Sequence, residues 1–144
     1  MARFALGGNS RNRIEVEVLG YERAPVGDHH DDNWLRVQIT VSAGAFSGSY
    51  EAAFLADELV AFRDQLETVC HSLRGEAKFS TLEDQLSLRL GGNGRGAIVV
   101  RGTAIDVAGT GNRLEFLLEL DQTDAQRTLT ELSAVVIAFP VRAG

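Results

Sequence analysis

Two histidines and three aspartates stand together in residues 27–34, which read GDHHDDNW. Imidazole nitrogen and carboxylate oxygen suit divalent ions such as zinc. Metal ligands must converge, but neighbouring residues on an extended chain point apart. A loop could instead bring each histidine beside the aspartate two positions later. One interpretation of the segment is therefore a metal site built from His29, His30, Asp31 and Asp32.

The same segment also has the composition of a solvent-exposed connection between two strands. Aspartate and asparagine stabilise turns by hydrogen bonding to nearby backbone groups. We favour this interpretation, in which residues 27–32 form a solvated loop whose acids attract a partner. We expect neither a metal nor another cofactor. The alternative function is a small-ligand or metal-binding module that uses residues 29–32.

The only tryptophan of the chain, Trp34, follows this segment directly. By alternation it falls on the polar face of the next strand, together with Arg36 and Gln38. An exposed tryptophan on that face is a candidate interface residue. The alternative is that a helix or loop covers it.

Two further motifs have structural explanations. The glycines of residues 91–96, GGNGRG, are spaced like those of a phosphate-binding loop, but a strand is predicted after them instead of the required helix. The pair Asn93-Gly94 is typical of a type I′ hairpin turn. Cys70 and His71 adjoin, but neighbours on a helix diverge by roughly 100°. The sequence has no GxSxG or HExxH motif, and we expect no catalytic residue and no enzymatic activity.

The size and charge of the chain limit its function. Its 144 residues are enough for one α+β domain, residues 1–144, with a core of its own. Twenty acidic and fourteen basic residues give a net charge of −6, which disfavours nucleic acid and anionic membranes and favours a basic partner. No apolar run is long enough for a signal peptide or a membrane span, and the single cysteine cannot form an internal disulfide. We therefore expect a cytoplasmic protein.

Alternating apolar and polar residues predict a series of strands. The first two, residues 13–21 and 33–41, are expected to pair as antiparallel neighbours. A third is predicted in residues 43–54, with Gly44 in a turn and Gly48 at a bulge or a close backbone approach. Four more follow, at residues 76–80, 85–90, 96–105 and 112–120.

Two segments have a helical period. In residues 55–74 the apolar residues recur at spacings of three and four, which places one stripe along an amphipathic helix, and Gly75 suits a left-handed C-cap. A second helix is predicted over residues 123–139. Thr123 would cap its N-terminus, and Gln126 would reach back as in a capping box.

These elements predict an α+β fold. Short turns between consecutive strands favour antiparallel pairing, and each apolar helix stripe needs a sheet face to cover. We expect one curved antiparallel sheet of about seven to eight strands with both helices packed on it. The exposed edges of such a sheet would also permit a homodimer through strand pairing.

The outward faces of the predicted strands carry both acidic and basic side chains. Opposite charges on neighbouring strands contribute only about 0.2 to 1 kcal/mol each. These charges therefore have a structural role, a partner-docking role, or both. The residues that we expect to contact a partner are Glu15, Glu17, Asp28, Asp31, Asp32, Trp34, Glu115 and Glu119.

Six short pieces, in order over most of the chain, form a further pattern: Asn33-Trp34-Leu35, FSGSY at 46–50, Gly75-Glu76-Ala77, QLSL at 85–88, Leu114-Glu115-Phe116 and LDQT at 120–123. In this combination the chain resembles the WapI-type immunity proteins of bacterial polymorphic-toxin systems. No single piece is a chemical signature, so the resemblance rests on all of them together.

The resemblance implies a cytoplasmic, noncatalytic protein that protects its producer by binding the toxic domain of a cognate secreted toxin, often a nuclease. It implies no catalytic residues. A nuclease has a basic, phosphate-binding cleft, so an acidic inhibitor would gain association rate from long-range attraction. We therefore predict an immunity protein that neutralises a basic toxin domain by direct binding.

Overall fold

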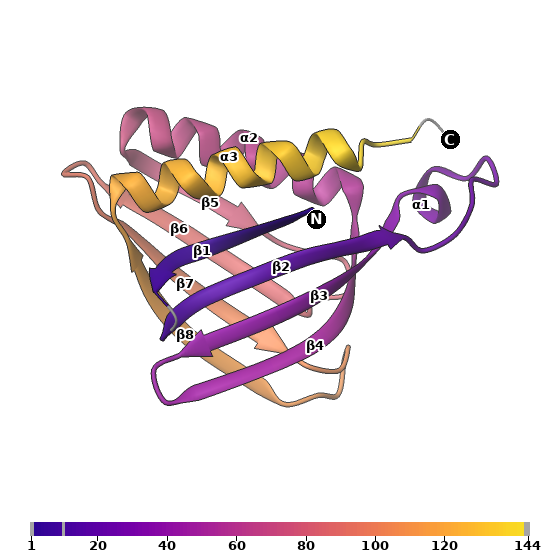
Figure 1. Cartoon of the computed structure of the whole chain (residues 1–144), viewed down its shortest axis with the longest axis horizontal. Helices are drawn as coiled ribbons and strands as arrows, with labels where there is room; N and C mark the ends of the chain where they lie inside the picture. The colour runs from indigo at the N-terminus through magenta and orange to yellow at the C-terminus, as the bar shows by residue number, and fades with distance from the viewer. Residues whose placement is uncertain (1, 10, 143–144) are drawn as a thin grey trace.

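The computed structural model describes residues 2–9 and 11–142 of the chain. Figure 1 shows its elements in chain order. They are β1 (Arg3–Asn9), β2 (Asn12–Tyr21), α1 (His29–Asp32), β3 (Trp34–Ala43), β4 (Phe46–Leu55), α2 (Ala56–Ser72), β5 (Arg74–Phe79), β6 (Leu86–Asn93), β7 (Ile98–Ile105), β8 (Arg113–Leu120) and α3 (Gln122–Ala138).

The strands form two four-stranded antiparallel sheets. Sheet A has the order β1-β2-β3-β4, and sheet B has the order β5-β6-β7-β8. The α+β class and the antiparallel pairing are confirmed, but the strands divide into two sheets where the sequence suggested one. The division has a simple cause, because the 17 residues of α2 separate β4 from β5, so the chain leaves one sheet before it starts the next. In Figure 1 sheet A lies in front of sheet B, their strands cross, and α2 and α3 lie together along one end.

The core lies between the two sheets and beneath the helices. Every second residue of a strand points into it, as the fully buried Ile14 and Val16 of β2 illustrate. Three phenylalanines join the layers: the Phe79 ring of β5 has its centroid 4.9 Å from that of Phe54 in β4 and 5.2 Å from that of Phe62 in α2. All three side chains are buried, and each contributes about 1.5 to 3 kcal/mol by leaving water.

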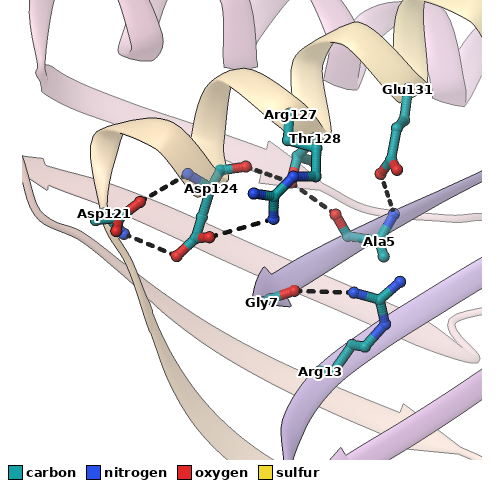
Figure 2. Close-up of polar contacts among 8 residues, drawn as sticks. All are labelled: Ala5, Gly7, Arg13, Asp121, Asp124, Arg127, Thr128 and Glu131. Carbon is teal, nitrogen blue, oxygen red and sulfur yellow. Dashed lines mark hydrogen bonds and ion pairs between the residues drawn. The ribbon is translucent and has the colours of Figure 1, made fainter. Parts of the chain in front are cut away.

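Helix α3 covers the free edge of β1, a strand that the sequence did not reveal. Figure 2 shows the two contacts, both to the main chain of Ala5. The Thr128 hydroxyl donates to the Ala5 carbonyl at 2.6 Å, and the Glu131 carboxylate accepts from the Ala5 N–H at 3.0 Å. The polar groups that an edge strand leaves unpaired are thus satisfied by helix side chains instead of another strand.

Both long helices are confirmed, but their ends differ from the expected ones. Asp121 caps α3 and Asp124 completes the capping box, in place of Thr123 and Gln126 (Figure 2). The left-handed C-cap of α2 is Leu73, with a φ of 56°, whereas the expected Gly75 lies within β5. A carboxylate accepts charge-assisted hydrogen bonds from the first N–H groups of a helix, so Asp121 prevails over the nearby threonine.

Two turn predictions also change. Gly44 lies in the β3–β4 turn as expected, with a φ of 63°. The strand register runs without a shift past Gly48, and a Cβ there would meet no atom within 4 Å, so both the bulge and the close backbone approach expected at Gly48 are wrong. The register shifts instead between Val18 and Gly20. The turn at Asn93 is longer than a two-residue hairpin, because β7 begins only at Ile98.

No helix in the described part of the chain is both long and apolar enough to cross a membrane.

We predict that Thr128→Val destabilises the protein by about 1 to 3 kcal/mol, because it leaves the buried Ala5 carbonyl without its donor while keeping the side-chain shape. Urea unfolding followed by circular dichroism measures the change. Thr130→Val is the control, since Thr130 is exposed on the same helix and should change stability by less than about 0.5 kcal/mol. Equal effects of the two substitutions would contradict the edge role of Thr128.

A second stability prediction concerns Gly102 in β7. A Cβ added there would collide with the ring of Phe116, so Gly102→Ala should cost about 1 to 3 kcal/mol through overpacking. Gly91→Ala in the neighbouring strand β6 is the control, because a Cβ at Gly91 meets no atom within 4 Å. Thermal unfolding of both variants checks the difference, and a Gly102→Ala variant as stable as Gly91→Ala would refute this packing.

Candidate functional site

The GDHHDDNW segment folds into a short helix whose polar groups hold its own backbone. Asp28 caps α1 by accepting from the Asp31 N–H at 3.0 Å. Asp32 is only 1% exposed, and its carboxylate accepts from the Val26 N–H at 2.6 Å and the Gly27 N–H at 3.0 Å. The expectation of a solvated loop is therefore wrong for Asp32, because the preceding backbone turns its N–H groups toward this carboxylate.

The four residues of the metal interpretation do not converge. His29 Nε2 lies 2.8 Å from a carboxylate oxygen of Asp57 at the start of α2, and Asp31 lies 3.9 Å from Arg23. Asp32 faces its own backbone, as described above. Within residues 2–9 and 11–142, no three His, Cys, Asp or Glu side chains are grouped so that they could hold a metal ion.

The end of the segment holds the C-terminal tail. The buried Asn33 amide donates to the Arg142 carbonyl at 3.1 Å, and its oxygen accepts from the Arg142 N–H at 2.7 Å. The Arg142 guanidinium lies 3.4 Å from the centroid of the Tyr21 ring. Trp34 opens β3 on the outer face of sheet A and is half-buried there. The segment thus joins α1, α2 and the tail.

The acids expected to contact a partner are divided among several places. Glu15 and Glu17 lie on the outer face of sheet A, where Glu15 pairs with Arg13 at 3.3 Å. Glu115 and Glu119 lie on the outer face of sheet B. Asp28 and Asp31 are at α1. Since the outer faces of two packed sheets point in opposite directions, these residues cannot form one surface.

The outer face of sheet B also carries a row of cations. Lys78 is opposite Arg89 in the strand register, and Arg89 is opposite Arg101, beside a hollow of about 460 Å³. Glu76 lies within 3.7 Å of Lys78 and 3.5 Å of Arg89, whereas Arg101 has no ion pair to another described residue. Because a row of positive charge repels other cations, this part of sheet B disfavours a basic partner.

A polar junction joins the free edge of β4 to the end of sheet B. We call Tyr50, Glu51, Gln85, Ile105 and Asp106 the Gln85 junction. The Tyr50 hydroxyl donates to the Gln85 carbonyl at 2.7 Å, and the buried Gln85 amide donates to three carbonyls at 3.2 to 3.5 Å, those of Asp106, Ile105 and Glu51. Burial raises the pKa of Tyr50, and nearby Asp106 raises it further, so this phenol remains a neutral donor.

Negative charge surrounds the Gln85 junction. Glu51, Glu83, Asp84 and Asp106 are all exposed there, against one cation, Arg113. Two hollows open at this end, of about 190 Å³ and about 470 Å³, and both include Arg113 in their walls. The arrangement can attract and hold a basic segment, while nothing in it pairs a nucleophile with a base.

The sequence did not point to this junction, for an identifiable reason. Tyr50 and Gln85 are 35 positions apart, and each looked like an ordinary strand residue. The one available signal was the glutamine at the start of the strand predicted over residues 85–90. A lone polar residue ahead of the buried Leu86 and Leu88 needs partners of its own.

Comparisons with known proteins give one strong match. The model of the immunity protein WapI-like family matches residues 5–140. No curated protein matches the chain. Among solved structures, a similar chain is that of the siderocalin Ex-FABP, described as functioning through dual ligand specificities. It is 9% identical with a TM-score of 0.29, over 95% of this chain and 82% of that one. A likeness this weak carries no argument.

We predict that Asp32 acts by holding the turn before α1. Asp32→Ala should destabilise the protein by about 1 to 3 kcal/mol, because it removes two charge-assisted hydrogen bonds from the Val26 and Gly27 N–H groups to a buried carboxylate. Asp31→Ala, at a more exposed position, should change stability by less than about 0.5 kcal/mol. Thermal unfolding with and without zinc checks both points. A zinc-dependent rise in melting temperature that His29→Ala abolishes would support the metal interpretation instead.

Proposed function

This chain belongs to the WapI-like immunity protein family, and on that premise we propose that it binds a cognate toxin domain directly and neutralises it. The observation that carries the proposal is the length of the match, residues 5–140, which takes in both sheets and all three helices. The proposed role is noncatalytic and needs no cofactor, since a stable complex alone blocks the toxin.

The charge of the chain supports a basic partner, such as a nuclease domain. A net charge of −6 gives long-range attraction to a basic, phosphate-binding cleft, which raises the association rate. The charge is unevenly distributed. The cation row on sheet B, Lys78, Arg89 and Arg101, disfavours such a partner, whereas the Gln85 junction is strongly acidic. The side of sheet A and the junction is therefore the better docking side.

Co-expression tests the proposal. The toxin domain encoded by the neighbouring reading frame is induced in a sensitive strain with this chain, with an unrelated immunity protein, or alone. We expect growth to be restored only by this chain, and a stable complex to be isolated from the same cells. Continued killing, together with no complex between the purified proteins, would refute the proposed function.

The expected contact acids can be distinguished by neutralising them in groups. Three double variants remove the pairs Asp28 and Asp31, Glu15 and Glu17, or Glu115 and Glu119, each by Asp→Asn or Glu→Gln. A pair inside the interface should raise the Kd for the toxin domain at least about 10-fold, mainly through faster dissociation. A pair outside it should slow association only a few-fold and only at low salt. Surface plasmon resonance at two salt concentrations measures both rates.

We expect the pair on sheet A to behave as interface residues and the pair on sheet B to serve as the matched control. The reason is the cation row, which lies on the same face as Glu115 and Glu119 and repels a basic partner. Asp32 is left unchanged in these variants, because it is buried and holds the backbone. The opposite ranking of the two sheets would contradict the proposed docking side.

A further inference from the structure

One half of the edge of β4 has no cover. In the β3–β4 hairpin the turn closes on the pair Ala43 and Phe46, so the hydrogen bonds to β3 come from alternate residues of β4. The residues between them turn their main-chain groups to the free edge, as the Glu51 carbonyl does when it accepts from Gln85. Ser47 and Ser49 have the same parity as Glu51. Among the described residues, nothing bonds to their edge-facing main-chain groups.

The other outer strands show how this chain protects a free edge. Side chains of α3 bond to the main chain of Ala5 in β1. Gln65 of α2 accepts from the Lys78 N–H of β5 at 2.9 Å. Native proteins also protect free edges with charge, proline or bulges. The outer strand β8 carries such charges, Glu115 and Glu119. Residues 46–50 of β4, FSGSY, contain none of these, and their register with β3 is regular.

Space for a partner lies beside this edge. The hollow of about 190 Å³ has Ser47, Gly48 and Tyr50 on one side and Ala104 and Leu114 on the other. A Cβ at Gly48 would meet no atom within 4 Å. Pockets for small molecules are usually about 300 to 1,000 Å³, so this one suits a single apolar side chain better than a ligand.

An exposed aromatic ring and an unpaired acid flank the same edge. Phe46 is 67% exposed and lies two residues before Gly48, so its side chain is on the same face of β4 as the hollow. A strand added to β4 would cover part of its ring. Glu51 is exposed on the outer face and forms no ion pair with another described residue. With Asp84 and Asp106 close by, this surface favours a cationic partner over a second acidic copy of this chain.

We propose that an extended, basic segment of the toxin domain adds as a fifth strand to the free edge of β4 at Ser47–Glu51. Its main chain pairs with Ser47 and Ser49, an apolar side chain enters the hollow beside Gly48, and a lysine or arginine lies next to Glu51. The inference rests on the proposed function, since it assigns the contact surface of that complex.

Amide hydrogen exchange on the complex tests the proposal without any variant. The probe is the toxin domain encoded by the neighbouring reading frame, bound to the full chain. The amides of Ser47 and Ser49 should exchange at least about 10-fold more slowly in the complex than in the free protein. The amides of Gly48 and Tyr50, already bonded to β3, should change much less.

Two variants test the same edge by affinity. Ser49→Pro removes the edge-facing N–H and should raise the Kd for the toxin domain at least about 10-fold. Ser49→Ala keeps the N–H and is the matched control, expected within about 3-fold of wild type. Circular dichroism verifies that both variants fold.

The outcomes separate this inference from the proposed function. Wild-type protein that does not bind the toxin domain overturns both. Wild-type protein that binds while the Ser47 and Ser49 amides stay unprotected overturns the strand addition alone. Since the exchange measurement uses wild-type protein, it decides the question even if Ser49→Pro does not fold.

Discussion

Contact among three aromatic rings holds the two sheets and a helix together. Phe54 belongs to sheet A, Phe79 to sheet B and Phe62 to α2, and both ring pairs have centroids within 5.2 Å. Each sheet buries its apolar face against the other sheet, and α2 closes one end of the core. Each of the three layers therefore needs the other two to bury its apolar residues. This packing fixes the positions of the outer strands of both sheets. Several of the hydrogen bonds between side chains and main chain described above are made at these outer strands.

Two packed sheets leave four outer strands, and side chains bond to main-chain groups on three of them. Thr128 and Glu131 serve β1, Gln65 serves β5, and Gln85 takes the Glu51 carbonyl of β4. Such bonds cost the fold little, since a side chain replaces the missing strand. Among the described residues, no such bond reaches β8 or the half of β4 before Glu51. The strand β8 carries Glu115 and Glu119, whereas residues 46–50 of β4 carry no charge. In a protein whose proposed function is binding, an edge left open beside a hollow has a direct use.

The acidic residues also fall into two groups, those that stabilise the fold and those that are exposed and available to a partner. Asp32, Asp121 and Asp124 accept hydrogen bonds from backbone N–H groups, so these acids act within the fold. The acids around the Gln85 junction outnumber its single cation and remain exposed. The net charge of −6 thus includes a part bound up in the structure and a part that can act on a partner.

The sequence by itself determined the α+β class, the two long helices, seven of the strands and the antiparallel pairing, because hydrophobic periodicity reports which face of an element is buried. Together with the six short pieces, it also indicated the immunity family. It did not determine that the strands form two sheets, that β1 exists as an edge, or that Asp32 is buried. Nor did it bring Tyr50 beside Gln85 or leave Ser47 and Ser49 uncovered. Those features depend on contacts between residues far apart in the chain. A local pattern of apolar and polar residues does not indicate which distant group will form a hydrogen bond with a given polar atom.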